Sequence, residues 1–153
     1  MIALSLLVAA SLQTTGFVAG WEMMKGSGGE CGAAAKFVDD SLFMVFLLPG
    51  QKNARVSIGN TAWRSIREGQ TYNLVVRFKG KPVQVTGRGS EQNGVHSILI
   101  DVDRGSVIRS MFMRDTIGFE VEGVKLFAMT PQSNDPVYAL TQCAKGANDP
   151  LAR

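Results

Sequence analysis

Apolar and polar residues alternate along much of the chain after residue 20, a pattern typical of half-buried β-strands. In residues 71–78, the side chains of Tyr72, Leu74 and Val76 would share one face of such a strand. Residues 41–48, SLFMVFLL, are apolar without a break, which predicts a strand buried on both faces. Further strands are predicted at residues 21–25, 31–38, 55–58, 83–86, 96–102, 119–121 and 124–128.

Turn residues separate several of these strands. Lys79-Gly80-Lys81-Pro82 predicts a hairpin between residues 71–78 and 83–86, and Glu122-Gly123 predicts another between the last two strands. Residues 87–94, GRGSEQNG, are polar and rich in glycine, so we expect a loop there. Strands joined by such short turns pair antiparallel.

Two segments change to a helical period. Ile108, Met111 and Phe112 recur at helical spacing after Ser106, which is placed to cap a short internal helix. Residues 133–136, Ser-Asn-Asp-Pro, are typical of a second helix start, because proline fits the first helical turn. The pattern as a whole predicts an α+β fold that is mostly β: an antiparallel, sandwich-like sheet domain with one short internal helix and a C-terminal helix. On the C-terminal helix, the inner face is predicted to carry Val137, Leu140, and Cys143 or Ala144.

The first twenty residues, MIALSLLVAASLQTTGFVAG, indicate a signal peptide. They carry no charge, and their apolar run is long enough for a secretory signal but too short for a membrane-spanning helix. Val18 and Gly20 suit the small-residue positions of a cleavage site, which would leave residues 21–153 as one exported domain. No Lys or Arg precedes the apolar run, so an N-terminal strand of the fold and an uncleaved anchor remain alternatives.

The chain has two cysteines, Cys31 and Cys143. Export implies an oxidising compartment, where two thiols in a small domain usually pair. Such a bond would close a very long loop and would stabilise the fold by about 4–5 kcal/mol in the chain-entropy model. The alternative is two separate reduced thiols. We expect no structural zinc site, because two cysteines and one histidine at unrelated spacings do not form one.

Charge adds little to this picture. The chain has 153 residues, 45% of them hydrophobic, with a formal net charge of +3. No run of basic residues exceeds two, which argues against a nucleic-acid partner. Four cations near one predicted hairpin, Arg77, Lys79, Lys81 and Arg88, form a candidate site for an anionic partner such as a phospholipid, a polysaccharide or an acidic protein. The alternative is a solvated strand edge that discourages aggregation.

The sequence offers no convincing catalytic or cofactor motif. His96 is the only histidine, and no nucleophile motif accompanies it, so we expect a structural or surface role. Asp101 and Asp103 begin like a calcium loop, but Gly105 and Phe112 occupy positions where that loop needs ligands. We therefore expect no catalytic residue, no cofactor and no bound metal.

Several short motifs occur in a fixed order along the chain. They are Trp21, Cys31, Asn60-x-x-Trp63, Glu68-Gly69-Gln70-x-Tyr72, Phe119-x-Val121-x-Gly123-Val124 and Ala139-Leu140-x-x-Cys143. This order resembles that of small exported alphaproteobacterial proteins of unknown function and, more distantly, that of the invasion-associated locus B family of periplasmic proteins. The resemblance implies a β-rich fold with a Trp and a terminal disulfide, located in the periplasm or outside a Gram-negative cell, and it assigns no catalytic residue.

These observations favour an exported, non-enzymatic binding or structural module that engages a protein, an envelope component or a host-derived ligand. A second hypothesis is an inhibitor or immunity-type protein that uses residues 87–94 to plug a secreted enzyme. A third is a small hydrolase that uses His96 with Asp101 or Asp103.

Overall fold

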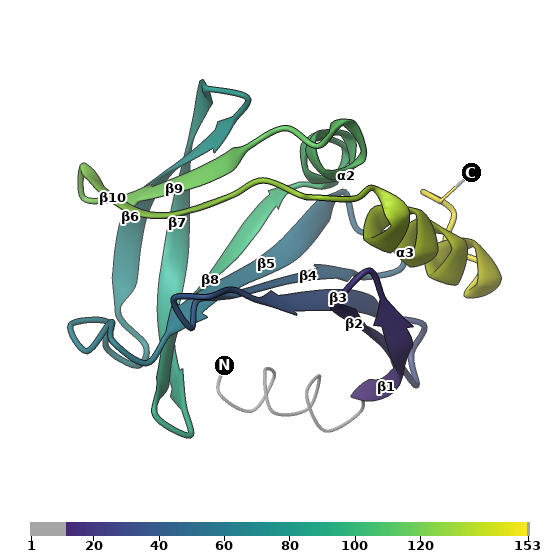
Figure 1. Cartoon of the computed structure of the whole chain (residues 1–153), viewed down its shortest axis with the longest axis horizontal. Coiled ribbons are helices and arrows are strands. Elements are labelled where there is room, and N and C mark those ends of the chain that lie inside the picture. Colours follow the sequence, from purple (N-terminus) through teal and green to yellow (C-terminus); the bar gives the residue numbers. More distant parts are fainter. Residues whose placement is uncertain (1–11, 153) are drawn as a thin grey trace.

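The computed structural model describes residues 12–152, in which ten antiparallel strands form one continuous curled sheet and two helices pack against it (Figure 1). The order across the sheet is β1-β2-β3-β4-β5-β8-β7-β6-β9-β10. The predicted mostly-β α+β class is therefore confirmed. The strands are β1 Leu12–Val18, β2 Trp21–Gly26, β3 Cys31–Lys36, β4 Leu42–Leu47, β5 Asn53–Asn60, β6 Thr71–Phe78, β7 Lys81–Gln92, β8 Val95–Asp103, β9 Ile117–Val121 and β10 Val124–Met129.

The curl of the sheet places the core on its inner face. Figure 1 shows β9 and β10 lying across from β2, β3 and β4, with the two helices at one side. Every second residue of each central strand points into this space, as the alternation predicts. On β4 these residues are Phe43, Val45 and Leu47, which are essentially inaccessible to solvent. The outer face of β4 is only partly covered: Phe46 is buried and packs over Gly32, whereas Met44 is half-buried.

The prediction of a loop at residues 87–94 is wrong. Residues 81–92 form the long strand β7, and only Asn93-Gly94 makes the turn into β8. Packing explains the glycines, because a Cβ on Gly89 would lie 2.0 Å from the carbonyl oxygen of Arg67. A Cβ on Gly87 would lie 2.5 Å from Ile98. The glycines therefore permit close approach within a strand, and they do not mark a loop.

Helix α2, Arg104–Met113, begins earlier than predicted. Its N-cap is Asp103, whose carboxylate accepts a 2.8 Å hydrogen bond from the backbone N–H of Ser106, so the prediction of Ser106 as the cap is wrong. The inner face also differs, because Arg104 and Ser110 are buried while Phe112 is 48% exposed.

Helix α3, Asp135–Gly146, is the predicted C-terminal helix. Proline stands in its first turn, and its buried residues include Val137, Leu140 and Ala144, as predicted. The helix packs on β2 and β3. Within residues 12–152, neither helix is long and apolar enough to cross a membrane.

The predicted disulfide between Cys31 and Cys143 is present. It joins β3 to α3 across a sequence separation of 112 residues, with the Cα atoms 6.0 Å apart. A second link lies just beyond the helix. The guanidinium of Arg104 contacts Asp149 Oδ2 at 2.8 Å, and both side chains are almost fully buried. Cys31, α3, Arg104 and residues 147–152 together form what we call the fastened region.

The predicted signal peptide overlaps the fold. Residues 1–11 lie outside the described part of the chain, and residues 12–18 form the edge strand β1, which pairs with β2. Cleavage after Gly20 would remove β1 and leave β2 as the edge of the sheet. The proposed boundary at residue 21 therefore stays a prediction.

Candidate functional site

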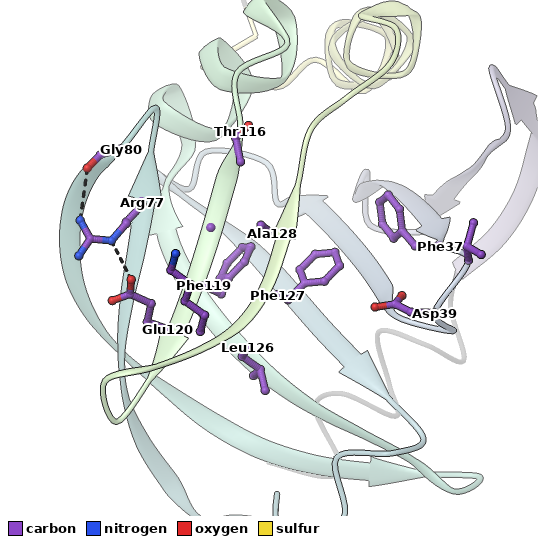
Figure 2. A pocket seen from close by; sticks show the side chains of 13 residues that line it. Phe37, Asp39, Arg77, Gly80, Thr116, Phe119, Glu120, Leu126, Phe127 and Ala128 are labelled. Carbon is purple, nitrogen blue, oxygen red and sulfur yellow. Dashed lines mark hydrogen bonds and ion pairs between the residues drawn. The ribbon is translucent and has the colours of Figure 1, made fainter.

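A solvent-open hollow of about 730 Å³ lies where the turn between β3 and β4 approaches β9 and β10 (Figure 2). Three parts of the chain that are distant in sequence meet there: the β3–β4 turn, the end of β6 with its turn, and the β9–β10 hairpin. Most of the lining is apolar, with a few charged side chains. The lining residues are Phe37, Val38, Asp39, Arg77, Gly80, Thr116, Gly118, Phe119, Glu120, Lys125, Leu126, Phe127 and Ala128.

The β3–β4 turn forms one wall. The N–H of Asp40 donates to the carbonyl of Phe37, and Asp40 adopts a left-handed backbone with φ 65°. This turn directs the Phe37 ring toward Phe127 of β10, edge-on with the ring centroids 5.4 Å apart. Val38, the next residue, has no cover and is fully exposed. Val38 therefore extends the apolar lining of the hollow to its rim.

Aromatic rings continue from this wall into the core. Phe127 stacks on Phe119 with the centroids 6.1 Å apart. Phe119 in turn contacts Phe43 at 6.2 Å, and Phe43 contacts Trp21 at 5.9 Å. The rings at the hollow are therefore backed by a packed aromatic cluster, which holds them in place.

Small residues leave the space open. Gly118 of β9 lies in register between Arg77 of β6 and Ala128 of β10. A Cβ on Gly118 would meet only the Cβ of Arg77, at 3.8 Å. Neither close packing nor a left-handed backbone conformation therefore requires glycine at this position. A bulge between Lys125 and Phe127 adds local twist to β10. The missing side chain at Gly118 therefore leaves open the part of the hollow beside Arg77, on the face of β9 opposite to Phe119.

A charged cluster forms the wall opposite the β3–β4 turn. Arg77 Nε donates to Glu120 Oε1 at 2.9 Å, and a terminal nitrogen of Arg77 donates to the carbonyl of Gly80 at 3.3 Å. The hydrogen bond from Arg77, followed by the charges of Arg77 and Lys125, lowers the pKa of Glu120 below its ordinary value. Glu120 is therefore ionised at neutral pH, between two cations.

Asp39 lies at the other side of the hollow, as Figure 2 shows, and its carboxylate is negative whereas the cluster of Arg77, Lys125 and Glu120 is positive overall. Its carboxylate accepts a 3.0 Å hydrogen bond from the backbone N–H of Ser41. This bond, together with one from the Ser41 side chain, lowers the pKa of Asp39. The hollow is thus apolar along its length, acidic at one end and richer in cations at the other.

The four predicted cations do not gather at one place. Arg77, Lys79 and Lys81 lie at the β6–β7 turn, where Phe78 pairs with Lys81. Arg88 pairs with Thr71 at the far end of the same hairpin, about seven residues or 23 Å away. Of the four, only Arg77 lines the hollow.

The residues of the hydrolase hypothesis also lie apart. His96 Nδ1 is 3.0 Å from the carbonyl oxygen of Ile66. Asp101 forms an exposed ion pair with Arg55, and Asp103 caps α2. Because Asp101 lies five residues along β8 from His96, the two side chains point to opposite faces of the strand. Among residues 12–152, no group of three or more His, Cys, Asp or Glu side chains is arranged to hold a metal ion.

A second hollow of about 290 Å³ lies on the outer face of the sheet, over β4, β5, β7 and β8. Its lining includes Met44, Phe46 and Leu99, and also Leu12 from β1. The shape of this hollow therefore depends on a segment that signal cleavage would remove. The hollow at β10 contains no residue of β1.

No family model, curated protein or solved structure matches this chain. The assignment of the hollow as a candidate binding site consequently depends on its geometry alone.

Proposed function

We propose that this protein is an exported, non-enzymatic binding module that holds an apolar ligand in the hollow between the β3–β4 turn and β10. A space of this size, with apolar walls and a few polar groups, is typical of small-molecule sites. The observation that carries the proposal is the open hollow of about 730 Å³ lined by Phe37, Phe119 and Phe127, with the ion-paired Arg77 and Glu120 at its wall.

Export is supported by two features. A disulfide persists in oxidising compartments such as the periplasm, and Cys31–Cys143 is bonded here. The resemblance to small exported alphaproteobacterial proteins favours the same location. An envelope component is therefore the expected source of the ligand. The inhibitor hypothesis loses its proposed plug, because residues 87–92 are part of strand β7.

The experiment is a fluorescence titration with N-phenyl-1-naphthylamine, a neutral apolar dye that brightens in apolar sites. Gly118→Leu places a side chain in the hollow, where only the Cβ of Arg77 is near the new Cβ. Gly146→Leu is the matched control, because Gly146 is also open and lies at the end of α3. We expect at least about tenfold weaker dye binding for Gly118→Leu, a loss of about 1.4 kcal/mol, and unchanged binding for Gly146→Leu. Equal binding by all three proteins would contradict the proposal.

A separate measurement tests export. Mass spectrometry of the protein secreted by its host, with and without reductant, reports the mature N-terminus and the thiol state together. We expect a chain that begins at Trp21 and carries two fewer hydrogens before reduction. Recovery of the full-length chain with both thiols free would contradict export.

A further inference from the structure

The charges around the hollow indicate which kind of apolar ligand it takes. Arg77 and Lys125 flank the single carboxylate of Glu120, so this wall has a net charge of +1. The Arg77 side chain is 41% exposed, whereas that of Glu120 is 17% exposed. A ligand that enters from solvent therefore meets the cations before it meets the carboxylate.

The cations also have donors left for a ligand. A guanidinium has five N–H donors, and the described contacts of Arg77 use only Nε and one terminal nitrogen. Lys125 is exposed, and within residues 12–152 it makes no ion pair closer than 4 Å. Guanidinium and ammonium groups together suit a carboxylate, which the first binds through its planar fork and the second as a point charge.

The other end of the hollow disfavours an anion. Asp39 is ionised there, and the nearest residues on that side are the apolar Phe37 and Val38. Figure 2 shows Asp39 and Arg77 on opposite sides, with Phe127 between them. An anionic head group would be repelled at the Asp39 end and attracted at the Arg77 end. Because Arg77 and Phe127 lie on opposite faces of the β9–β10 hairpin, an apolar chain attached to that head would pass over the edge strand β10 to reach Phe127.

We infer that the hollow binds a single-chain amphiphile with one anionic head group, of the fatty-acid type, with the carboxylate at Arg77 and Lys125 and the chain against Phe127 and Phe37. This inference rests on the proposed function, because it names the ligand class of the same hollow. It differs from that function in one testable respect, which is the preference for the sign of the head group.

The test uses three probes with the same chain and different heads: decanoate, 1-decanol and decylammonium. The two ionic probes are kept below their critical micelle concentrations and 1-decanol below its solubility limit. Each probe is titrated against the full chain that carries bound N-phenyl-1-naphthylamine, and displacement of the dye gives the affinity. We expect decanoate to bind about fivefold to tenfold more tightly than 1-decanol, and decylammonium to bind more weakly than the alcohol.

Lys125→Glu reverses the sign of the net charge on the wall formed by Arg77, Glu120 and residue 125, and Lys52→Glu is the control. Both lysines are exposed and both substitutions change the net charge equally, but Lys52 lies outside the hollow. We expect Lys125→Glu to remove the preference for decanoate over 1-decanol and Lys52→Glu to preserve it. The new carboxylate would lie across from Glu120 in the β9–β10 register, so we expect a small loss of stability, and circular dichroism checks that the variant remains folded.

The outcomes separate the two proposals. If neither the dye nor any decyl probe binds, the proposed function itself fails. If all three decyl probes bind equally, or if Lys125→Glu leaves the preference for decanoate unchanged, the hollow remains a binding site and the inference about its ligand is overturned. Displacement that persists in Gly118→Leu would place the probes elsewhere, for example in the outer hollow, and would also overturn the inference.

Discussion

The fastened region and the hollow both contain apolar residues and an ion pair, but the two regions differ in how far these groups are exposed to solvent. In the fastened region, Cys31 and Leu140 are completely buried, and the Arg104–Asp149 pair is almost fully removed from solvent. At the hollow, Val38 is fully exposed and the Arg77–Glu120 pair remains partly accessible. One region therefore closes the fold, while the other leaves apolar and charged groups available to a ligand.

This difference shows where stability and binding reside in the molecule. The disulfide holds α3 against β3, and the buried ion pair holds the segment after α3 against the start of α2. The hollow at β9 and β10 lies outside both links. Proteins commonly separate the two roles in this way, because exposed apolar groups and unfilled space reduce stability. Variants in the fastened region should accordingly reduce stability more than variants at the hollow.

The largest effect is expected from removal of the disulfide. The double variant Cys31→Ala/Cys143→Ala loses the bond without leaving a free thiol, and we expect its free energy of unfolding to fall by about 4 kcal/mol. Urea unfolding of the variant and the parent protein measures this difference. A loss below about 1 kcal/mol would mean that the disulfide does not secure the fastened region.

The buried ion pair should rank next. Arg104→Met leaves the carboxylate of Asp149 buried without its cation, which typically costs about 3 kcal/mol or more. Arg55→Met is the matched control, because the Arg55–Asp101 pair is exposed and such pairs contribute at most about 1 kcal/mol. Equal losses in urea unfolding would contradict the distinction between the fastened region and the surface.

At the hollow, Phe127→Ala should have a smaller effect on stability and a larger effect on binding. Phe127 is half-buried, and it contacts the rings of Phe37 and Phe119. We expect a loss of about 2 kcal/mol in the free energy of unfolding, because a fully buried phenylalanine would cost 3–5 kcal/mol. N-phenyl-1-naphthylamine should bind the folded variant at least about tenfold more weakly. Undiminished binding of the dye would move the site away from the aromatic wall.

The smallest effect concerns acid stability. Burial raises the pKa of Asp149, but the N–H groups of Gly50 and Leu151 and the Arg104 guanidinium outweigh it and leave the pKa below 3.8. A carboxyl with a lowered pKa in the folded state adds stability above its unfolded pKa and loses it as the pH falls through the folded value. The free energy of unfolding should therefore fall below about pH 4.

The variant Arg104→Met tests whether the guanidinium contributes to this pH dependence. Without the guanidinium, only the N–H groups of Gly50 and Leu151 oppose the effect of burial, so the pKa of Asp149 should be higher than in the parent protein. The loss of stability with falling pH should then begin at a higher pH. Urea unfolding between about pH 3 and pH 7 gives both profiles. Parallel profiles would mean that Arg104 does not hold Asp149 in its ionised form.

Much of the fold follows from local patterns in the sequence. The alternation at residues 71–78 predicted β6 to the residue, and proline after capping residues predicted the start of α3. The expectation of export, together with the presence of two cysteines, predicted the disulfide. The strand and the helix start depend on residues that are neighbours in the chain. The disulfide follows from the presence of two thiols in an oxidising environment, without knowledge of where they lie.

The remaining features depend on contacts between distant segments. From the sequence alone, Gly87 and Gly89 indicate a loop. The structure shows that they are glycines because Ile98 and the Arg67 carbonyl approach them closely. The hollow has the same origin, because only the curl of the sheet brings Phe37 to Phe127, and no sequence signal links the two. Arg77 was predicted as a binding residue, but its partner Glu120 was not.

The most direct test is a two-dimensional NMR titration of the isotope-labelled chain with decanoate, which reports the ligand's position residue by residue. Binding in the hollow should concentrate the backbone amide shifts at Val38, Gly118, Lys125 and Phe127. Shifts that concentrate at Met44 and Leu99 on the outer face of the sheet, or an absence of shifts at saturating decanoate, would contradict it.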